Sequence, residues 1–189
     1  MASLATRGSM RMDGLVDRRN EISTVEFEGS SASFFRAETG GRKPLLVRIR
    51  ISGNLAPRML VTIENAPAPP WLEPSIQSIG RLLMLPRNWD LEDAPPVQVS
   101  SAQWALEGLA RFMGDASAAP QWTPTRAGGL QADWHQDGID LEIAFDCEYP
   151  GGYVLFSDLR DSASDWEGPL ASNLEKLRSI AESRLNGQL

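Results

Sequence analysis

The chain contains almost none of the residues that build disulfides and metal centres. Its 189 residues include one cysteine, Cys147, and one histidine, His135. One cysteine cannot close an intramolecular disulfide, and these two residues cannot supply a Cys/His metal site within one copy of the chain. We therefore expect a protein of a reducing compartment that is stabilised by its hydrophobic core and carries no metal ion.

Long apolar segments are also missing. No run approaches the roughly 18 residues of a membrane-spanning helix, and the first 20 residues carry charges where a signal peptide has its apolar segment. The sequence therefore predicts a cytoplasmic protein that does not bind membranes. Residues 1–20 show no apolar periodicity and are expected to be a flexible head or an expression remnant, followed by one domain over residues 21–189.

The sequence signatures of catalysis and cofactor binding are absent too. Nucleophilic catalysis needs a base beside the nucleophile, and His135 follows a strand pattern that places it beside Asp133 on the polar face. The glycine pairs at residues 128–129 and 151–152 precede strand patterns, whereas a phosphate-binding loop precedes a helix. We therefore predict no cofactor, no catalytic residue and no enzymatic activity.

Charge is the most informative property that the sequence does have. The net charge of −7 is uneven, because residues 1–94 carry +1 and residues 95–189 carry −8. Residues 133–167 alone contain ten acidic residues and one arginine. Such a density repels nucleic acid and attracts a basic protein surface. The acidic half is therefore expected to bind a basic protein partner and no nucleic acid.

The N-terminal half has strand patterns. Residues 45–51 and 59–63 alternate apolar and polar side chains and are expected to pair across a turn. Shorter patterns at residues 24–27 and 33–35 suggest a first hairpin. The proline-rich residues 67–70 then interrupt the sheet, and the chain could divide there into two subdomains.

The rest of the chain mixes helix and strand patterns. Helical spacing predicts helices beginning near Pro74 and Ser100, and an Asp137-Gly138 turn predicts a hairpin that a third strand at residues 149–156 extends. A long apolar stripe predicts a last helix from near Pro169. The expected fold is α+β, with antiparallel sheets and a C-terminal amphipathic helix packed on a three-stranded meander.

A partial resemblance to a known group covers residues 85–157. It rests on the Asn-Trp-Asp sequence in residues 85–90, on the Gly-Gly-Leu of residues 128–130 and on the hairpin that follows. These residues resemble a loosely defined group of uncharacterised bacterial and mobile-element proteins with an Asn-Trp-Asp-Gly-Tyr-Gly-Ala loop and a Gly-Gly-x-x-Leu-Glu-Trp hairpin. The present chain has Leu-Glu-Asp at residues 91–93 where the group has Gly-Tyr-Gly. The resemblance implies a compact α+β unit and, by analogy, an accessory or toxin-neutralising role.

Tryptophan beside an acidic residue is typical of a protein-contact hot spot. Two such pairs are Trp89–Asp90 and Asp165–Trp166. The hairpin adds carboxylates expected on one outward face, with a tryptophan among them in the sequence. The predicted partner-binding residues are Trp89, Asp90, Asp133, Trp134, Asp140, Glu142, Asp165 and Trp166.

Three functions compete on these observations. The leading hypothesis is a non-enzymatic protein-interaction module, accessory or toxin-neutralising, that binds a basic partner. One alternative is a small hydrolase, because Asp133, Asp140 and Glu142 could divide acid and base roles if they were buried. The other is a self-assembling structural protein, which leaves a homodimer open. Its basic face would comprise Arg36, Arg42, Lys43, Arg48, Arg50 and Arg58.

Overall fold

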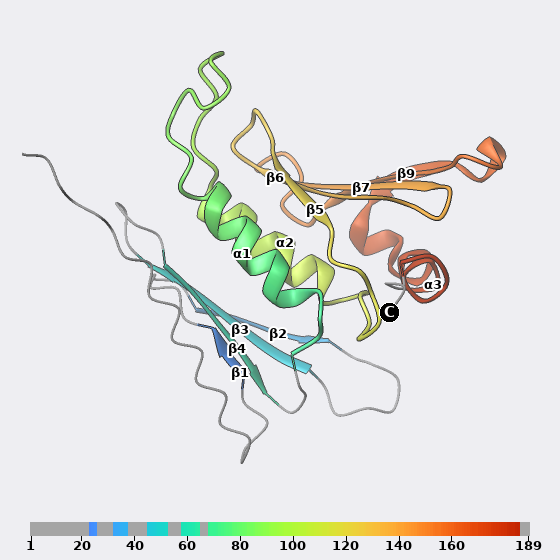
Figure 1. The fold of residues 1–189 in the computed structure, drawn as a ribbon, viewed down its shortest axis with the longest axis horizontal. Helices are drawn as coiled ribbons and strands as arrows, with labels where there is room; N and C mark the ends of the chain where they lie inside the picture. Colours follow the sequence, from blue (N-terminus) through green and yellow to red (C-terminus); the bar gives the residue numbers. More distant parts are fainter. Residues whose placement is uncertain (1–22, 26–31, 38–44, 53–57, 65–67, 186–189) are drawn as a thin grey trace, which may run out of the picture.

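The computed structural model describes residues 23–25, 32–37, 45–52, 58–64 and 68–185, with side chains from residue 68 onward. These residues form two antiparallel sheets and three α-helices, so the fold is α+β (Figure 1). The expected head at residues 1–20 lies outside them. The first sheet has the strand order β1-β4-β3-β2 and consists of β1 (Ser23–Val25), β2 (Ala32–Ala37), β3 (Leu45–Ser52) and β4 (Arg58–Glu64).

The predicted pairing of β3 with β4 is confirmed. Val47 lies opposite Ile63 and Ile49 opposite Val61, so apolar residues of the two strands share rows across the ladder. The suggested first hairpin is wrong, because β1 pairs with β4 and β2 pairs with β3. The two longest strands form the central pair, and each shorter strand extends one of its edges.

Two helices follow the first sheet. The helix α1 (Leu72–Leu82) has Pro74 in its first turn, where its missing N–H is tolerated, and it buries Ile76 and Ile79 at helical spacing. The helix α2 (Val99–Leu109) begins after Gln98, which is its N-cap in place of the serine that we expected. The first sheet ends before residues 67–70, and α1 begins after them. The two sheets share no strand.

The second sheet has the strand order β5-β6-β7-β8-β9, and the predicted meander forms its middle. The β6–β7 turn has φ values of 55° at Asp137 and 76° at Gly138, as the predicted two-residue hairpin requires. The two outer strands have four residues each and contain proline, so they lack a clear strand pattern. The strands are β5 (Gln121–Pro124), β6 (Leu130–Gln136), β7 (Ile139–Phe145), β8 (Tyr153–Asp158) and β9 (Trp166–Pro169).

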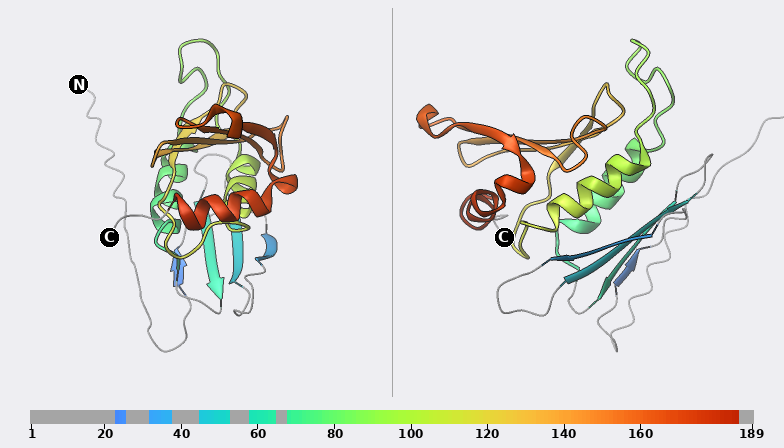
Figure 2. Two further views of the ribbon diagram at one scale, coloured as in Figure 1. Left: turned by 90° about the vertical axis from the view of Figure 1, so that its right-hand side faces the viewer. Right: turned by 180° about the vertical axis from the view of Figure 1, so that it is seen from behind.

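All three helices lie on one face of this second sheet. The helices α1 and α2 lie between the two sheets, and α3 (Leu174–Ser183) lies beside them (Figures 1 and 2). Short 3-10 turns at Ser162–Ser164 and Leu170–Ser172 flank β9. No helix among residues that the structure describes is long and apolar enough to cross a bilayer.

The C-terminal helix contributes to the core under this sheet, as predicted, through Leu177 and Ala181. It reaches the end of the sheet near the β6–β7 turn, where the Arg184 guanidinium donates to the Asp137 carbonyl oxygen and pairs with Asp158. The Phe145 end of β7 is packed by α2. The reason is local, because α2 has a glycine where it crosses that ring.

Candidate binding surface

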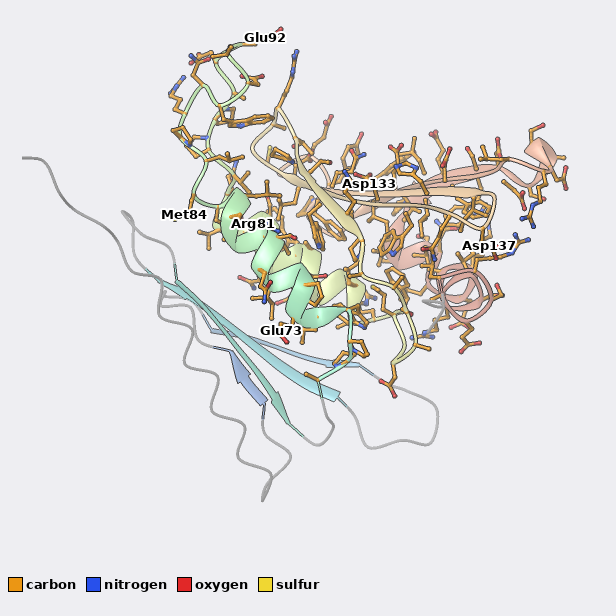
Figure 3. The ribbon with its side chains drawn as sticks, viewed as in Figure 1. Glu73, Arg81, Met84, Glu92, Asp133 and Asp137 are labelled. Atoms are coloured by element: carbon orange, nitrogen blue, oxygen red, sulfur yellow. The ribbon has the colours of Figure 1, made fainter. Side chains whose placement is uncertain are left out.

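The second sheet has one face that no described helix covers. In Figure 3, Asp133 lies on the side of the sheet away from the helices. Alternation along β7 places the buried Leu141 toward the helices and the half-buried Glu142 on that other side. We call this surface the outer face. It consists of Gln121, Thr123, Gln131, Asp133, His135, Asp140, Glu142, Ala144, Tyr153, Leu155, Ser157, Glu167 and Pro169.

Two carboxylates lie directly opposite each other on the outer face. Asp133 of β6 pairs with Glu142 of β7, and like charges in this arrangement repel. The Gln131 Nε2 amide donates to both, over 2.7 Å to Asp133 and 3.2 Å to Glu142. The Thr123 hydroxyl donates to the second Asp133 oxygen over 3.1 Å. Asp133, only 7% exposed, is therefore held in a fixed position by neutral donors.

The histidine lies on the same face, one row along. His135 Nδ1 lies 2.8 Å from Asp140 Oδ1 in a hydrogen bond. This bond is the main reason that the pKa of His135 is raised above its ordinary value of 6.5, and the charges of Asp140, Asp133 and Glu142 add to the effect. The outer face therefore loses negative charge as His135 becomes protonated.

The hydrogen bond between His135 and Asp140 can be followed through the imidazole pKa, because His135 is the only histidine in the chain. Titration of its imidazole by NMR is expected to give a pKa above 6.5, and Asp140→Asn is expected to lower that pKa. Because the pKa of His135 is raised in the folded state, its interaction with Asp140 stabilises the folded protein. This stabilisation is fully present below pH 6.5 and is lost as the pH rises through the folded pKa. An unchanged pKa in Asp140→Asn would contradict the assignment.

The arrangement of this row bears on nucleophilic catalysis with His135 as the base. Asp140 lies between His135 of β6 and Ser157 of β8. Because neighbouring strands are about 4.8 Å apart, roughly 10 Å separates the β6 and β8 backbones at this row. A base must lie within about 3 Å of the hydroxyl that it activates. Asp140, and not His135, therefore lies on the strand next to Ser157.

Among the described residues, no group of three or more histidine, cysteine or acidic side chains is arranged to hold a metal ion.

An apolar side chain interrupts the acidic row. Leu155 of β8 lies between Glu142 and Glu167 in the sheet register, and it is 43% exposed. Toward one end of the face, Tyr149 and Tyr153 pack with their ring centroids 4.8 Å apart. Burial, with a smaller contribution from the charge of Glu167, raises the pKa of Tyr153. The sequence analysis missed Leu155 because the face of a strand residue depends on the pairing register.

The predicted Trp134 and Trp166 do not lie on the outer face. Trp134 is 2% exposed, and its indole N–H donates to the Ala118 carbonyl oxygen over 3.0 Å. Trp166 stacks on Phe156 at 5.6 Å between ring centroids, and the Lys176 ammonium of α3 lies 4.7 Å from its ring. Both indoles therefore pack on the helix side of the sheet.

Asp165 has a structural role beside Trp166. Its carboxylate accepts a hydrogen bond from the backbone N–H of Asp158 over 2.9 Å. This bond ties the start of β9 to the end of β8. Of the predicted set, only Asp133, Asp140 and Glu142 are brought together on the outer face.

The remaining pair belongs to a loop at residues 85–97, which we call the projecting loop (Figure 1). The Trp89 indole N–H donates to the Pro95 carbonyl oxygen over 3.1 Å. The Asp90 carboxylate accepts from the backbone N–H groups of Glu92 and Ala94 over 2.9 and 3.1 Å. The first of these bonds is the main reason that the pKa of Asp90 is lowered. Trp89 and Asp90 therefore hold the loop in shape.

The large apolar residue that is exposed in this loop is Leu91, which follows Asp90. Leu91 is 87% exposed and has a φ of 64°, and Asn88 and Asp93 have φ values of 63° and 64°. Asparagine and aspartate tolerate this left-handed conformation, but it costs other residues about 1–2 kcal/mol. The sequence alone indicated neither the conformation nor the exposure of Leu91.

Comparisons with known proteins identify no relative of the chain. No protein-family model, no curated protein and no solved structure matches the chain.

Proposed function

We propose that the protein is a non-enzymatic interaction module whose outer face binds a basic protein partner. The observation that carries the proposal is Leu155, a large apolar side chain that is 43% exposed between Glu142 and Glu167 on a sheet face that no described helix covers. A face used only for solubility needs its charges and gains nothing from an exposed leucine within its acidic row. An accessory or toxin-neutralising role in bacteria rests on the resemblance alone.

The charges on the outer face specify the chemistry of the partner. Asp133, Asp140, Glu142 and Glu167 lie on it, and His135 is the one residue in its set that can carry a positive charge. An arginine or lysine of the partner can pair with Asp140, Glu142 or Glu167 while an apolar group covers Leu155. Asp133, which Gln131 and Thr123 hold in place and which is only 7% exposed, adds to the negative potential of the face without a direct contact.

Removing two of these charges is expected to slow association. Asp140→Asn combined with Glu142→Gln changes charge with little change in shape, so the free energy of unfolding is expected to move by less than about 1 kcal/mol. The association rate with the partner, isolated from the native host and then purified, is expected to fall about tenfold at low salt. The difference should shrink at high salt. Stopped-flow mixing or a biosensor measures both rates.

A matched control keeps the charge change and moves it elsewhere. Glu73→Gln with Glu175→Gln removes two negative charges from α1 and α3, and its association rate is expected to stay near that of the wild type. If both double variants slow association equally, net charge and not the outer face guides the partner. If neither does, the face is a solvated surface. Sedimentation of the protein alone at both salts tests whether the partner is a second copy.

A further inference from the structure

The conformation of Leu91 is costly in the free protein, and its own side chain makes almost no contact among the described residues that would offset the cost. Its side chain is 87% exposed, so it gains almost no packing from the described residues. Its φ of 64° is one that a bulky L-residue rarely adopts. Strain of this kind persists where the surrounding structure fixes it, and it clusters at functional sites. We infer that Leu91 inserts into an apolar pocket of the protein partner that covers the outer face.

Hydrogen bonds and ion pairs fix the projecting loop in the conformation that exposes Leu91. The Asn88 amide oxygen accepts from the Asp93 N–H over 2.8 Å, and the Arg87 guanidinium donates to both oxygens of Asp93 over 3.1 Å. Arg126, from the β5–β6 turn, pairs with Asp90 at 3.4 Å and with Glu92 at 2.6 Å. A loop fixed in this way loses little conformational entropy when its tip is bound.

The position of the loop relates it to the outer face. In Figures 1 and 2 the loop projects beyond the second sheet, on the side away from the first sheet and the helices. Figure 3 places Glu92 at its tip on the same side as Asp133. A partner seated on the outer face therefore meets the loop at one end of that face.

The residues beside Leu91 define the rim of the pocket. The side chains of Glu92 and Asp93 are 61% and 75% exposed beside the leucine, and they pair with Arg126 and Arg87, which are also exposed. A pocket that accepts a branched aliphatic side chain and has polar groups of both charge signs at its rim complements this tip. That this partner also covers the outer face and is basic rests on the proposed function, whereas the insertion of Leu91 into a pocket does not.

Two substitutions separate the strain from the contact. Leu91→Gly removes both the side chain and the backbone strain, so it is expected to raise the melting temperature by about 2–4 °C. Leu91→Ala removes the side chain and keeps the strain, so its melting temperature is expected to stay unchanged. Both variants are expected to dissociate from the purified partner at least about tenfold faster than wild type. Leu159→Gly, at another exposed leucine, is expected to do neither.

A photo-crosslinking residue identifies the partner independently of charge. Benzoylphenylalanine at position 91, introduced in the native host, is expected to give one discrete protein adduct. The same residue at Met84, which is 59% exposed at the end of α1, is expected to give none. The captured protein is then purified and its binding to the variants is measured. No adduct at position 91, equal adducts at both positions, or unchanged dissociation of Leu91→Ala would each overturn the inference.

The outcomes also separate this inference from the proposed function. If the Leu91 variants dissociate faster but the Asp140/Glu142 double variant associates normally, the loop is a contact and the outer face is not. If only the double variant is affected, the outer face binds the partner and Leu91 does not. A captured second copy of this chain would retain the contact and reject a basic partner of a different kind.

Discussion

Leu177→Asp is expected to abolish soluble expression. Leu177 is 0% exposed in α3 and belongs to the core between this helix and the second sheet. A carboxylate at that position would be buried without a partner, or would have to be protonated, and either costs several kcal/mol. Domains of this size are stabilised by only about 5–15 kcal/mol in total. Soluble yield and the far-ultraviolet circular dichroism of any soluble fraction measure the effect.

Two further variants make the result quantitative. Ser179→Asp adds the same charge to an exposed position of the same helix and is expected to fold with nearly unchanged stability. Leu177→Ala, which leaves a cavity, is expected to lower the free energy of unfolding by about 2–5 kcal/mol in urea. If Leu177→Asp folds with the melting temperature of the wild type, α3 does not dock where the structure places it.

Gly108→Ala is expected to destabilise the protein, although alanine normally stabilises a helix. A Cβ atom at Gly108 would lie 2.6 Å from Cε1 of Phe145, and the Phe145 ring is fully buried. A Cβ at Gly152 would lie 2.8 Å from the same ring atom, so the ring lies close to two glycine backbones and has little room to move. We expect a loss of about 1–3 kcal/mol from overpacking, which outweighs the helix preference of about 1 kcal/mol for alanine.

The clash can be tested by making room for it. Phe145→Leu alone is expected to destabilise the protein by opening a cavity. Combined with Gly108→Ala, the total loss of unfolding free energy should be smaller than the sum of the two single losses. Gly114→Ala is the matched control, because nothing lies within 4 Å of its added Cβ, and it is expected to be neutral. Additive losses in the double variant would show that Gly108 and Phe145 do not share a contact.

Features that depend on neighbouring residues could be read from the sequence. The Asp137-Gly138 turn, the alternation of β7 and the apolar spacing of α1 each follow from backbone geometry over a few residues. For the same reason, the prediction that Asp133, Asp140 and Glu142 share a face is confirmed. Alternation also places Trp134 on the face opposite Asp133, where it is buried.

Features that depend on distant segments needed the tertiary structure. The strands β5 and β9 have four residues each and are recognised only by their pairing with β6 and β8. The partner of β1 is β4, which lies more than 30 residues away in the chain. A sequence pattern describes the faces of one element, whereas pairing is a competition among all strands for the same edges. The first hairpin was therefore mispredicted and the β3–β4 pair was not.

The same distinction applies to the candidate surface. That residues 133–167 are strongly acidic is a property of the sequence, and the expectation of a basic partner follows from it. That Leu155 is exposed among those acids is decided by the register of β8, and that Leu91 extends from a strained loop is decided by hydrogen bonds and ion pairs over residues 87–126. The charge of a side chain follows from its residue type, whereas its exposure depends on how all the other segments pack around it.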